Sequence, residues 1–397
     1  MTITTGPTVH TSSPDPFLIP LLSIGNFVIG MGAFVIVGIL EPLGADMDRS
    51  PAQAGQLLTV YALSYAILSP LLVALTGRIG RRHVLTFAFA LFALAALLSA
   101  LAPNFALLNL GRVLAAAGAG LFTPLAAAVA AALYPEEQRA RVLAAVFFGL
   151  TLSQVLGVPA GSWIAYSFGW RYSFWLVLAL TLPINLLIWL RVPAELQFQP
   201  VSMIDLKRVI VQARMMLAVL FTGSFLGAIY VLYTYIAPLL SQTMDFGRDG
   251  ITLILVAFGI GAVGGNIMGG FLADRFGWRI TLIGLCLCQI ALMPLFSMLP
   301  FPPLALVALS FSWALFGWAF MSGQQVRLIG LAGPQAPVVL ALNAAAIYVG
   351  AAAGSALGGF VIARFGISAI GLAAGLSAIF ALLHLITSVR LSPSTSS

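Results

Sequence analysis

The sequence predicts an all-α integral membrane protein whose twelve transmembrane helices form two pseudo-symmetric six-helix bundles. Of its 397 residues, 61% are hydrophobic and only 7% are charged, and its mean hydropathy is +1.07. A soluble domain carries about 25% charged residues, whereas one helical crossing of a bilayer takes about 20 apolar residues. Twelve crossings with short loops therefore use the whole chain, and an internal repeat divides them into two sets of six.

Twelve apolar runs follow one another along the chain, and each predicts one span. The first six lie at residues 17–40, 53–76, 83–102, 105–133, 141–166 and 172–190. The second six lie at residues 213–239, 250–273, 280–299, 302–325, 337–362 and 367–389. Residues 1–16 lack the basic start of a signal peptide, which predicts a cytoplasmic tail. The predicted order is this tail, a bundle over 17–190, a cytoplasmic linker over 191–212, a bundle over 213–390 and a tail over 391–397.

The 18 cations lie almost entirely in the breaks between spans, where they indicate membrane orientation and not a nucleic-acid surface. Four lie in odd-numbered loops: Arg49, Arg171, Arg248 and Arg364. Thirteen lie in even-numbered loops or at the C-terminal end: Arg78, Arg81, Arg82, Arg139, Arg141, Arg191, Lys207, Arg208, Arg214, Arg275, Arg279, Arg327 and Arg390. Because cytoplasmic loops are enriched in Lys and Arg, the even-numbered side and both termini are predicted to be cytoplasmic.

The sequence offers little for chemistry other than transport. Cys286 and Cys288 lie two apart in one apolar run, so they point apart and do not form a disulfide or a metal site. No cofactor or metal is expected. A membrane-embedded enzyme is a remote alternative, because no paired carboxylates or activated nucleophile can be assembled, and a receptor is equally remote without a soluble domain.

An internal repeat at an offset of 197 residues supports the two-bundle division. In one region Arg78, Gly80 and Arg82 recur as Arg275, Gly277 and Arg279. In a second region, in the same register, the recurring residues are Gly157, Gly161, Phe168 and Gly169, which return as Gly354, Gly358, Phe365 and Gly366.

The loop after the eighth predicted span, GGFLADRFGWR at 269–279, resembles the signature loop of the major facilitator superfamily. The resemblance implies a cytoplasmic gate, in which Gly270 lets helices approach closely, Asp274 lies at a helix N-terminus and Arg275, Gly277 and Arg279 complete the loop. The first-half copy keeps Arg78, Gly80 and Arg82 but has Gly77 where the family has the acid. One of the two expected charge latches therefore lacks its carboxylate.

Longer segments, including SPAQAGQLLTVYAL at 50–63 and VLGVPAGSWIAYSFGWRYSFW at 155–175, resemble the bacterial twelve-helix drug/proton and sugar efflux antiporters. In the fifth span Gly157, Pro159 and Gly161 are similar to that subgroup's antiporter motif, which implies a kinked, tightly packed helix pair. Close packing alone is an equally good reading of these three residues.

Arg112 is the only charge deep inside a predicted span, where a charge costs about 2.5 kcal/mol or more on insertion scales. It matches the subgroup's span 4 arginine, and we expect it to face a central cavity and contact substrate or a coupling carboxylate. The alternative is an arginine that reaches outward to the lipid headgroups.

Proton coupling needs a group that binds and releases a proton, and here the sequence departs from the subgroup. Its span 1 usually carries a carboxylate, whereas this chain has Ala33 at that place. The remaining candidates are Glu41, which is expected to pair with Arg112 when the outer side is closed, and His384. Their alternatives are an interfacial cap before Pro42 and a packing residue, respectively.

In the superfamily, spans 1, 4, 7 and 10 line the central cavity. Transferred by position, the expected substrate-contacting residues are Asn26, Arg112, Thr123, Tyr230, Tyr233, Thr234, Gln324 and Gln325, with Asn343 of span 11 as a further candidate. The other expected wall residues are aliphatic or aromatic, which suits a small amphipathic ligand.

The resemblance implies a secondary active transporter of the bacterial inner membrane that exports a drug or sugar-like metabolite in exchange for protons. Its expected partners are a small-molecule substrate, protons and the lipid bilayer, with no nucleic acid, and the protein is expected to be a monomer. The alternative is a proton-independent facilitator, which the missing span 1 acid favours.

Overall fold

The computed structural model describes residues 15–194, 196 and 209–391, and every regular element in that part of the chain is helical. The first half contains α1 (Leu18–Asp46), α2 (Pro51–Ala54), α3 (Gln56–Leu75), α4 (Arg81–Ala100), α5 (Phe105–Leu133), α6 (Glu136–Leu152), a π-helical turn η1 (Ser153–Gly157), α7 (Val158–Phe168) and α8 (Trp170–Arg191). The second half contains α10 (Ala213–Tyr233), α11 (Ile236–Met244), α12 (Arg248–Leu292), α13 (Pro303–Trp318), α14 (Phe320–Ala332), α15 (Ala336–Phe365) and α16 (Ile370–Arg390), with 3-10 turns η2 (Met293–Met298), η3 (Gly333–Gln335) and η4 (Ile367–Ala369).

Local capping explains where two of the first-half helices begin. Ser50 and Gln53 form a reciprocal capping box at α2, and Pro51 occupies the first helical position, where a missing N–H costs nothing. At α5 the Asn104 side chain accepts from the Leu107 N–H at 2.9 Å. Both caps satisfy N–H groups that the helices themselves leave without partners.

Eleven helices among the described residues are long and apolar enough to cross a membrane. One of them, Arg248–Met298, has 51 residues and is interrupted at Gly277, whose φ of 74° and ψ of 156° are not helical. The Thr281 hydroxyl donates to the carbonyls of both Gly277 and Leu272, which draws the two arms together at this bend. Counting the arms separately would give the twelve predicted spans.

The two halves use repeated glycines at equivalent places. Gly169 and Gly366, which are equivalent in the repeat, both have positive φ, of 106° and 82°, and each follows the last residue of a helix. The other pair differs, because Gly277 has a φ of 74° whereas Gly80 has an ordinary φ of −54°. The repeat therefore preserves the helix end but not the conformation of the signature loop.

Close helix packing is also repeated between the halves. A Cβ on Gly161 of α7 would lie 2.3 Å from Val35 of α1, and one on Gly354 of α15 would lie 2.1 Å from the backbone oxygen of Gly227 of α10. These positions therefore accept only glycine without movement, as the tight-packing reading of the span 5 motif requires.

Gly270 corrects one expectation about the signature loop. A Cβ there would meet nothing within 4 Å, so this glycine does not bring helices together in this structure. Its neighbour Gly269 has that role, because a Cβ at this position would lie 2.2 Å from the Ala319 carbonyl oxygen. The motif pattern placed the close approach one residue too late.

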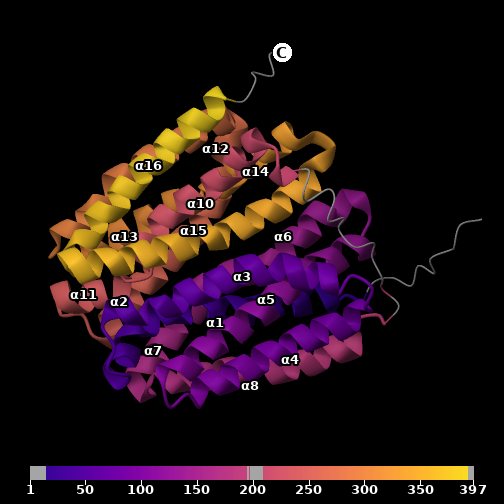
Figure 1. Ribbon diagram of the computed structural model, residues 1–397, viewed down its shortest axis with the longest axis horizontal. Coiled ribbons are helices and arrows are strands. Elements are labelled where there is room, and N and C mark those ends of the chain that lie inside the picture. Colours follow the sequence, from indigo (N-terminus) through magenta and orange to yellow (C-terminus); the bar gives the residue numbers. More distant parts are fainter. Residues whose placement is uncertain (1–14, 195, 197–208, 392–397) are drawn as a thin grey trace, which may run out of the picture.

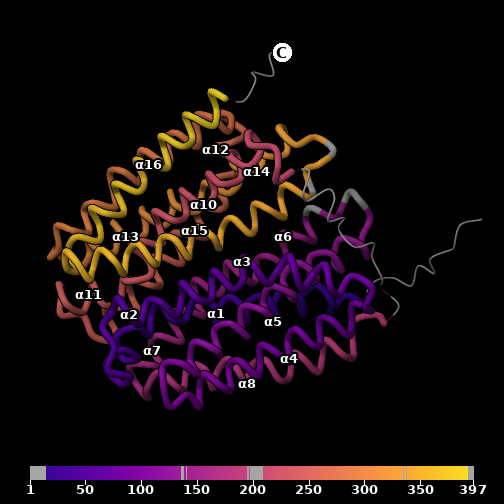
Figure 2. The backbone as a smooth tube through the Cα atoms, in the orientation of Figure 1, coloured from indigo at the N-terminus to yellow at the C-terminus, as the bar shows by residue number. Residues whose placement is uncertain are grey.

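Figure 1 shows the two halves side by side, the indigo-to-magenta half against the orange-to-yellow half, and Figure 2 gives the same path as a tube. The main contacts between them join α3 to α15, α12 to η1 and α7, and α1 to α11. We call the end that holds the beginning of α1 and the Gly277 bend the arginine-rich end, and the other the arginine-poor end. Within the described residues, the hydrogen bonds and ring contacts between halves lie in the middle or toward the arginine-poor end.

Candidate functional site

Aromatic rings from both halves meet near the middle of the molecule. Phe34 of α1 stacks on Tyr230 of α10 with ring centroids 6.1 Å apart. Tyr65 of α3 stacks on Tyr348 of α15 at 3.6 Å, and Tyr61 lies 6.3 Å from the same Tyr348 ring. These rings form the interdomain aromatic cluster: Phe34, Tyr61, Tyr65, Tyr230 and Tyr348. The contacts form two groups, Phe34 with Tyr230 and Tyr348 with Tyr61 and Tyr65, and each group contains rings from both halves.

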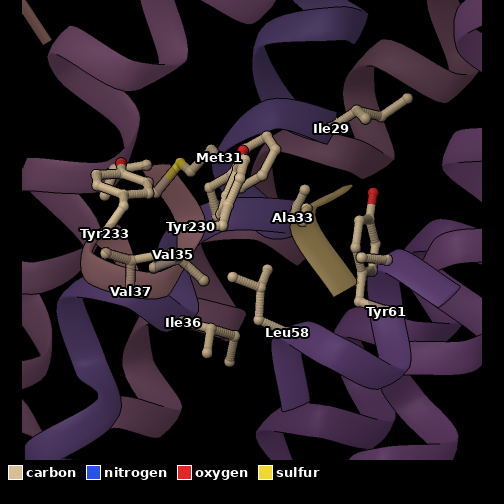
Figure 3. Packing of buried hydrophobic residues seen from close by; sticks show 14 of the residues in the cluster. Ile29, Met31, Ala33, Val35, Ile36, Val37, Leu58, Tyr61, Tyr230 and Tyr233 are labelled. Carbon is tan, nitrogen blue, oxygen red and sulfur yellow. The ribbon is translucent and has the colours of Figure 1, made fainter. Parts of the chain in front are cut away.

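Arg112 of α5 points into this region. Its side chain is 1% exposed, and its Nη1 and Nη2 donate to the backbone carbonyls of Gly32 and Ala33 at 2.7 and 2.6 Å. The guanidinium also lies 4.5 Å from the centre of the Tyr61 ring, a cation–π contact. Figure 3 shows Ala33 between Tyr230 and Tyr61. The arginine thus faces the protein interior and does not reach outward to the headgroup region.

The expected ion pair between Arg112 and Glu41 is absent, although the halves are in contact at the arginine-poor end. Glu41 accepts a hydrogen bond from the Tyr166 hydroxyl of α7 at 2.7 Å and another from the Ser241 hydroxyl of α11. The reason is reach: Arg112 is held by α1 carbonyls about two turns before Glu41, which is more than 10 Å along the helix axis. Glu41 instead bridges the two halves.

Tyr233 makes a second polar bridge between halves. Its hydroxyl donates to Oε1 of Gln154, in the π-helical turn of the first half, at 2.9 Å, and its ring stacks on Phe258 at 4.3 Å. The hydroxyl of Thr234, the residue after Tyr233, donates to the Tyr230 carbonyl one turn earlier at 2.7 Å. Of the three span 7 candidates, the two tyrosines therefore face the interface, and the threonine serves its own helix.

The other predicted polar residues form separate networks inside each half. In the first half, Thr123 donates to Oδ1 of Asn26, whose amide in turn donates to the Val146 carbonyl, both at 3.0 Å. In the second half, the amide of Gln324 donates to the Ala218 carbonyl at 2.8 Å and to Thr222, which itself donates to Asn343. These residues are buried and hold helices together in this conformation.

Gln325 is exposed on α14, beside the buried Gln324. The structure thus separates the two adjacent glutamines that the sequence analysis grouped together, because neighbours on a helix point about 100° apart.

His384 of α16 has a partner on each ring nitrogen. Nε2 lies 3.0 Å from the Leu217 carbonyl, and Nδ1 lies 2.7 Å from the Ser224 hydroxyl. Because a carbonyl only accepts, Nε2 carries a proton, and Nδ1 accepts from the serine in the neutral ring. The histidine fastens α16 to α10 within the second half and is remote from the bridge at Glu41.

Arg327 was expected in a loop, but it lies inside α14 and is 2% exposed. Its Nη2 donates to the Ser388 hydroxyl at 2.6 Å, and its guanidinium lies 5.3 Å from the Trp278 ring centre. The apolar run was ended at residue 325, whereas the helix continues to Ala332. The sequence analysis also missed Gln154 and three members of the interdomain aromatic cluster, Phe34, Tyr61 and Tyr65. The only sequence signal for any of these was the i, i+4 spacing of Tyr61 and Tyr65, which places both on one helix face.

The signature loops lie at the arginine-rich end and differ in how they are held. In the first half, Nε of Arg82 donates to the Val192 carbonyl at 2.6 Å, and the guanidinium lies over Trp189. In the second half, Asp274, Arg275 and Arg279 are exposed. Among the described residues, no hydrogen bond or ion pair joins this second loop to the first half. The predicted carboxylate latch is therefore not engaged in this conformation.

The comparisons with known proteins agree on one family. The profile described as Major Facilitator Superfamily matches residues 22–336. The Inner membrane transport protein YdhP of Escherichia coli (strain K12) is 32% identical over 375 residues, which cover 94% of this chain and 96% of that protein. The Uncharacterized MFS-type transporter YtbD of Bacillus subtilis (strain 168) is 29% identical over 351 residues, covering 87% and 88% of the two chains.

Two solved structures have a similar fold at 18% sequence identity. A bacterial homologue of the human lysosomal transporter Spinster, in an inward-facing and unoccupied conformation, aligns with a TM-score of 0.77 over 95% of this chain and 98% of that one. The D-xylose-proton symporter aligns with a TM-score of 0.70 over 92% and 96%. At this identity the two structures indicate a shared fold.

Proposed function

Because this chain belongs to the major facilitator superfamily, we propose that it exports a small amphipathic compound by alternating access, in exchange for protons. Superfamily transporters move a bound substrate by rocking one half against the other around a site near the membrane midplane. The interdomain aromatic cluster, with Arg112 beside it, lies where both halves contribute and is our candidate for that site.

The distribution of arginines supports a cytoplasmic position for the arginine-rich end. With that orientation, the halves are closed on the outer side and the conformation is inward-facing. The Spinster homologue with which the chain aligns was also solved in an inward-facing conformation. Export would then begin from the cytoplasmic side, with the paired rings parting to admit substrate between the halves.

The observation that carries the proton proposal is the bridge at Glu41. Its carboxylate accepts from Tyr166 of one half and Ser241 of the other, so its protonation state acts directly on the outer closure. An ionised carboxylate only accepts hydrogen bonds, whereas a protonated one has one acceptor site fewer and one donor to place. We propose that a proton delivered to Glu41 rearranges this bridge and, with it, the closure of the halves at this end.

Coupling requires in addition that the bound proton leave toward the cytoplasm as the outer side closes again. Glu41 is only partly buried, and the buried hydroxyl of Tyr233 lies deeper in the same interface. A route through the interface would return Glu41 to its ionised form and complete the exchange.

A second candidate function, a proton-independent facilitator, is favoured by the surroundings of Arg112. Ala33 stands where the antiporter subgroup usually has an acid, and its backbone carbonyl, not a carboxylate, accepts from the arginine. A centre without a titratable partner would bind substrate equally well at any pH and would carry it only down its own gradient.

The deciding experiment is reconstitution of the purified protein in liposomes that contain a pH-sensitive dye, with substrate flux measured with and without an imposed pH gradient. For an exchanger, substrate accumulates against its gradient while protons move the other way. Glu41→Gln should keep substrate binding and abolish this accumulation. Asp46→Asn is the matched control, because Asp46 lies on the same helix at the same end and its hydrogen-bond partners among the described residues, Arg171 and Trp170, belong to its own half.

Flux that ignores the gradient in the wild-type protein would replace the exchanger with the facilitator. Accumulation that survives in Glu41→Gln would remove Glu41 from the coupling mechanism.

A further inference from the structure

The charge of Arg112 has no counterion in the structure. No salt bridge to Arg112 occurs within the described part of the chain, and Glu41, on the neighbouring helix α1, is occupied by Tyr166 and Ser241. Two backbone carbonyls and one ring face are the charge's main compensation. A buried cation without an opposite charge is costly, so the site favours a ligand that brings a negative group and disfavours one that brings a second positive charge.

Two donors beside this charge are also left without a partner. Nε of Arg112 and the hydroxyl of Tyr61 are both buried, and neither has a hydrogen-bond partner among the described residues. Both residues are almost completely shielded from solvent, at 1% and 0% exposure. An unpartnered buried donor costs free energy that a bound acceptor recovers. The two donors and the positive charge therefore favour the same kind of ligand group, a carboxylate or another anionic oxygen acceptor.

The rest of the site consists of flat ring faces paired across the boundary between the halves. Tyr65 of α3 lies against Tyr348 of α15, and Phe34 of α1 lies against Tyr230 of α10. Any motion that separates the halves must part these rings and leave their faces without contacts. A planar aromatic ligand would restore the lost stacking. A sugar brings several hydroxyl groups, and the two unpartnered donors named above, Nε of Arg112 and the Tyr61 hydroxyl, would pair with only two of them.

From these contacts we propose that the substrate is a small planar aromatic acid, whose ring lies between the paired tyrosine and phenylalanine faces and whose carboxylate binds Arg112 and Tyr61. This inference rests on the proposed transport function and narrows the amphipathic ligand to one charge class.

The test compares naphthoate, naphthamide and naphthylmethylammonium, which share one ring system and differ in charge, with decahydronaphthoate, which has the charge but no aromatic ring. Binding to the purified protein in nanodiscs is measured by calorimetry. Naphthoate should bind roughly tenfold or more tightly than the ammonium compound, because the latter brings a second positive charge close to Arg112. It should also bind more tightly than decahydronaphthoate.

Three variants locate the effect. Arg112→Gln should remove the preference for naphthoate over naphthamide, and Ala33→Asp, which adds a carboxylate in the turn that binds Arg112, should shift the preference toward the ammonium compound. Arg327→Gln is the matched control, because it removes another buried arginine, which lies among Trp278, Phe221 and Ser388 of the second half. It should leave the ratio of affinities unchanged. Melting temperatures of all three variants check that they fold. If Arg112→Gln does not fold, Ala33→Asp still tests the proposal.

Equal affinity for naphthoate and the ammonium compound, no binding of any naphthyl compound, or an unchanged ratio in both site variants would overturn the proposal. These outcomes are separate from failure of the transport proposal. Proton-coupled flux of sugars or cations would support the exchanger and contradict the aromatic-acid substrate. Tight naphthoate binding without flux would support the aromatic-acid site and contradict the transport proposal.

Discussion

At the scale of single residues, the unusual feature is a pair of buried arginines that lack carboxylate partners in the described structure. Arg112 is held by two α1 carbonyls and the Tyr61 ring, and Arg327 by the Ser388 hydroxyl and the rings of Trp278 and Phe221. Arginine is suited to such places, because its planar guanidinium stacks on aromatic faces and is more weakly hydrated than an ammonium group. Arg112 lies over Tyr61, which contacts Tyr348 of the other half, whereas the Trp278 and Phe221 rings beside Arg327 belong to the second half, as Arg327 does. Arg112 is therefore the one of this pair that is placed to sense a ligand between the halves.

The residue scale also separates the two candidate coupling groups. His384→Gln keeps a side chain that can donate to the Leu217 carbonyl and accept from Ser224, as the neutral histidine does. We expect this variant to retain at least about half of the wild-type accumulation driven by a pH gradient, because an intact packing contact requires no titration. The measurement is the liposome flux assay. Loss of gradient dependence, with binding intact, would instead make His384 the coupling group.

At the scale of helices, glycines determine which pairs approach most closely. Gly354 and Gly358 of α15 lie against the backbone of α10, and Gly157 and Gly161 lie against α1 in the first half. Between helices in a membrane there is no hydrophobic driving force, so association depends on such close backbone contact. Gly157 and Gly354 are 197 residues apart, as are Gly161 and Gly358. The repeat in the sequence thus corresponds to the same helix crossing formed once in each half.

The helix crossing gives a stability prediction. In Gly354→Ala the new Cβ would lie 2.1 Å from the Gly227 carbonyl oxygen, which cannot move without its helix. Overpacking of this kind costs about 1–3 kcal/mol, so the melting temperature in detergent should fall. Gly284→Ala is the control, because a Cβ there meets nothing within 4 Å; helix propensity should make it neutral or up to about 1 kcal/mol stabilising. Equal effects of the two substitutions would show that the crossing has room to relax.

At the scale of the whole molecule, the two halves are joined at the middle and the arginine-poor end and are not latched at the arginine-rich end. Glu41, Tyr233 and the aromatic cluster make the contacts between halves, while Asp274 is exposed. Because Gly77 replaces the acid in the first-half loop, we predict that closure of the arginine-rich end depends on the one carboxylate of the second loop. The asymmetry favours the conformation seen here.

Asp274→Asn should therefore increase the population that is open at the arginine-rich end. Spin labels at Ile79 and Ile280, which are exposed in the two signature loops, report on this end, and labels at Phe168 and Phe365 report on the other. We expect a larger share of long Ile79–Ile280 distances and little change between the other pair. Distances that match the wild type at both ends would remove the latch role of Asp274. Gly77→Asp is the complementary variant and should shift the first pair toward shorter distances.

The sequence by itself determined the helical class and the positions of most spans, because hydrophobic length is a local property of a chain in a bilayer. The run at 105–133 coincides with α5, and the recurring glycines Gly169 and Gly366 each follow the last residue of a helix. The inward-facing position of Arg112 was also predictable from the sequence, because a cation inside an apolar run must find partners.

Only the tertiary structure decided which polar groups meet. Asn26 and Thr123 satisfy each other, Glu41 binds Ser241 across the boundary between halves and not Arg112, and Arg327 is buried where a loop was expected. Such pairings depend on helix rotation and on the register between helices far apart in sequence, and neither is encoded in the hydrophobic pattern of one span. The physical reason is that the bilayer constrains each helix separately, whereas a buried hydrogen bond is a property of two.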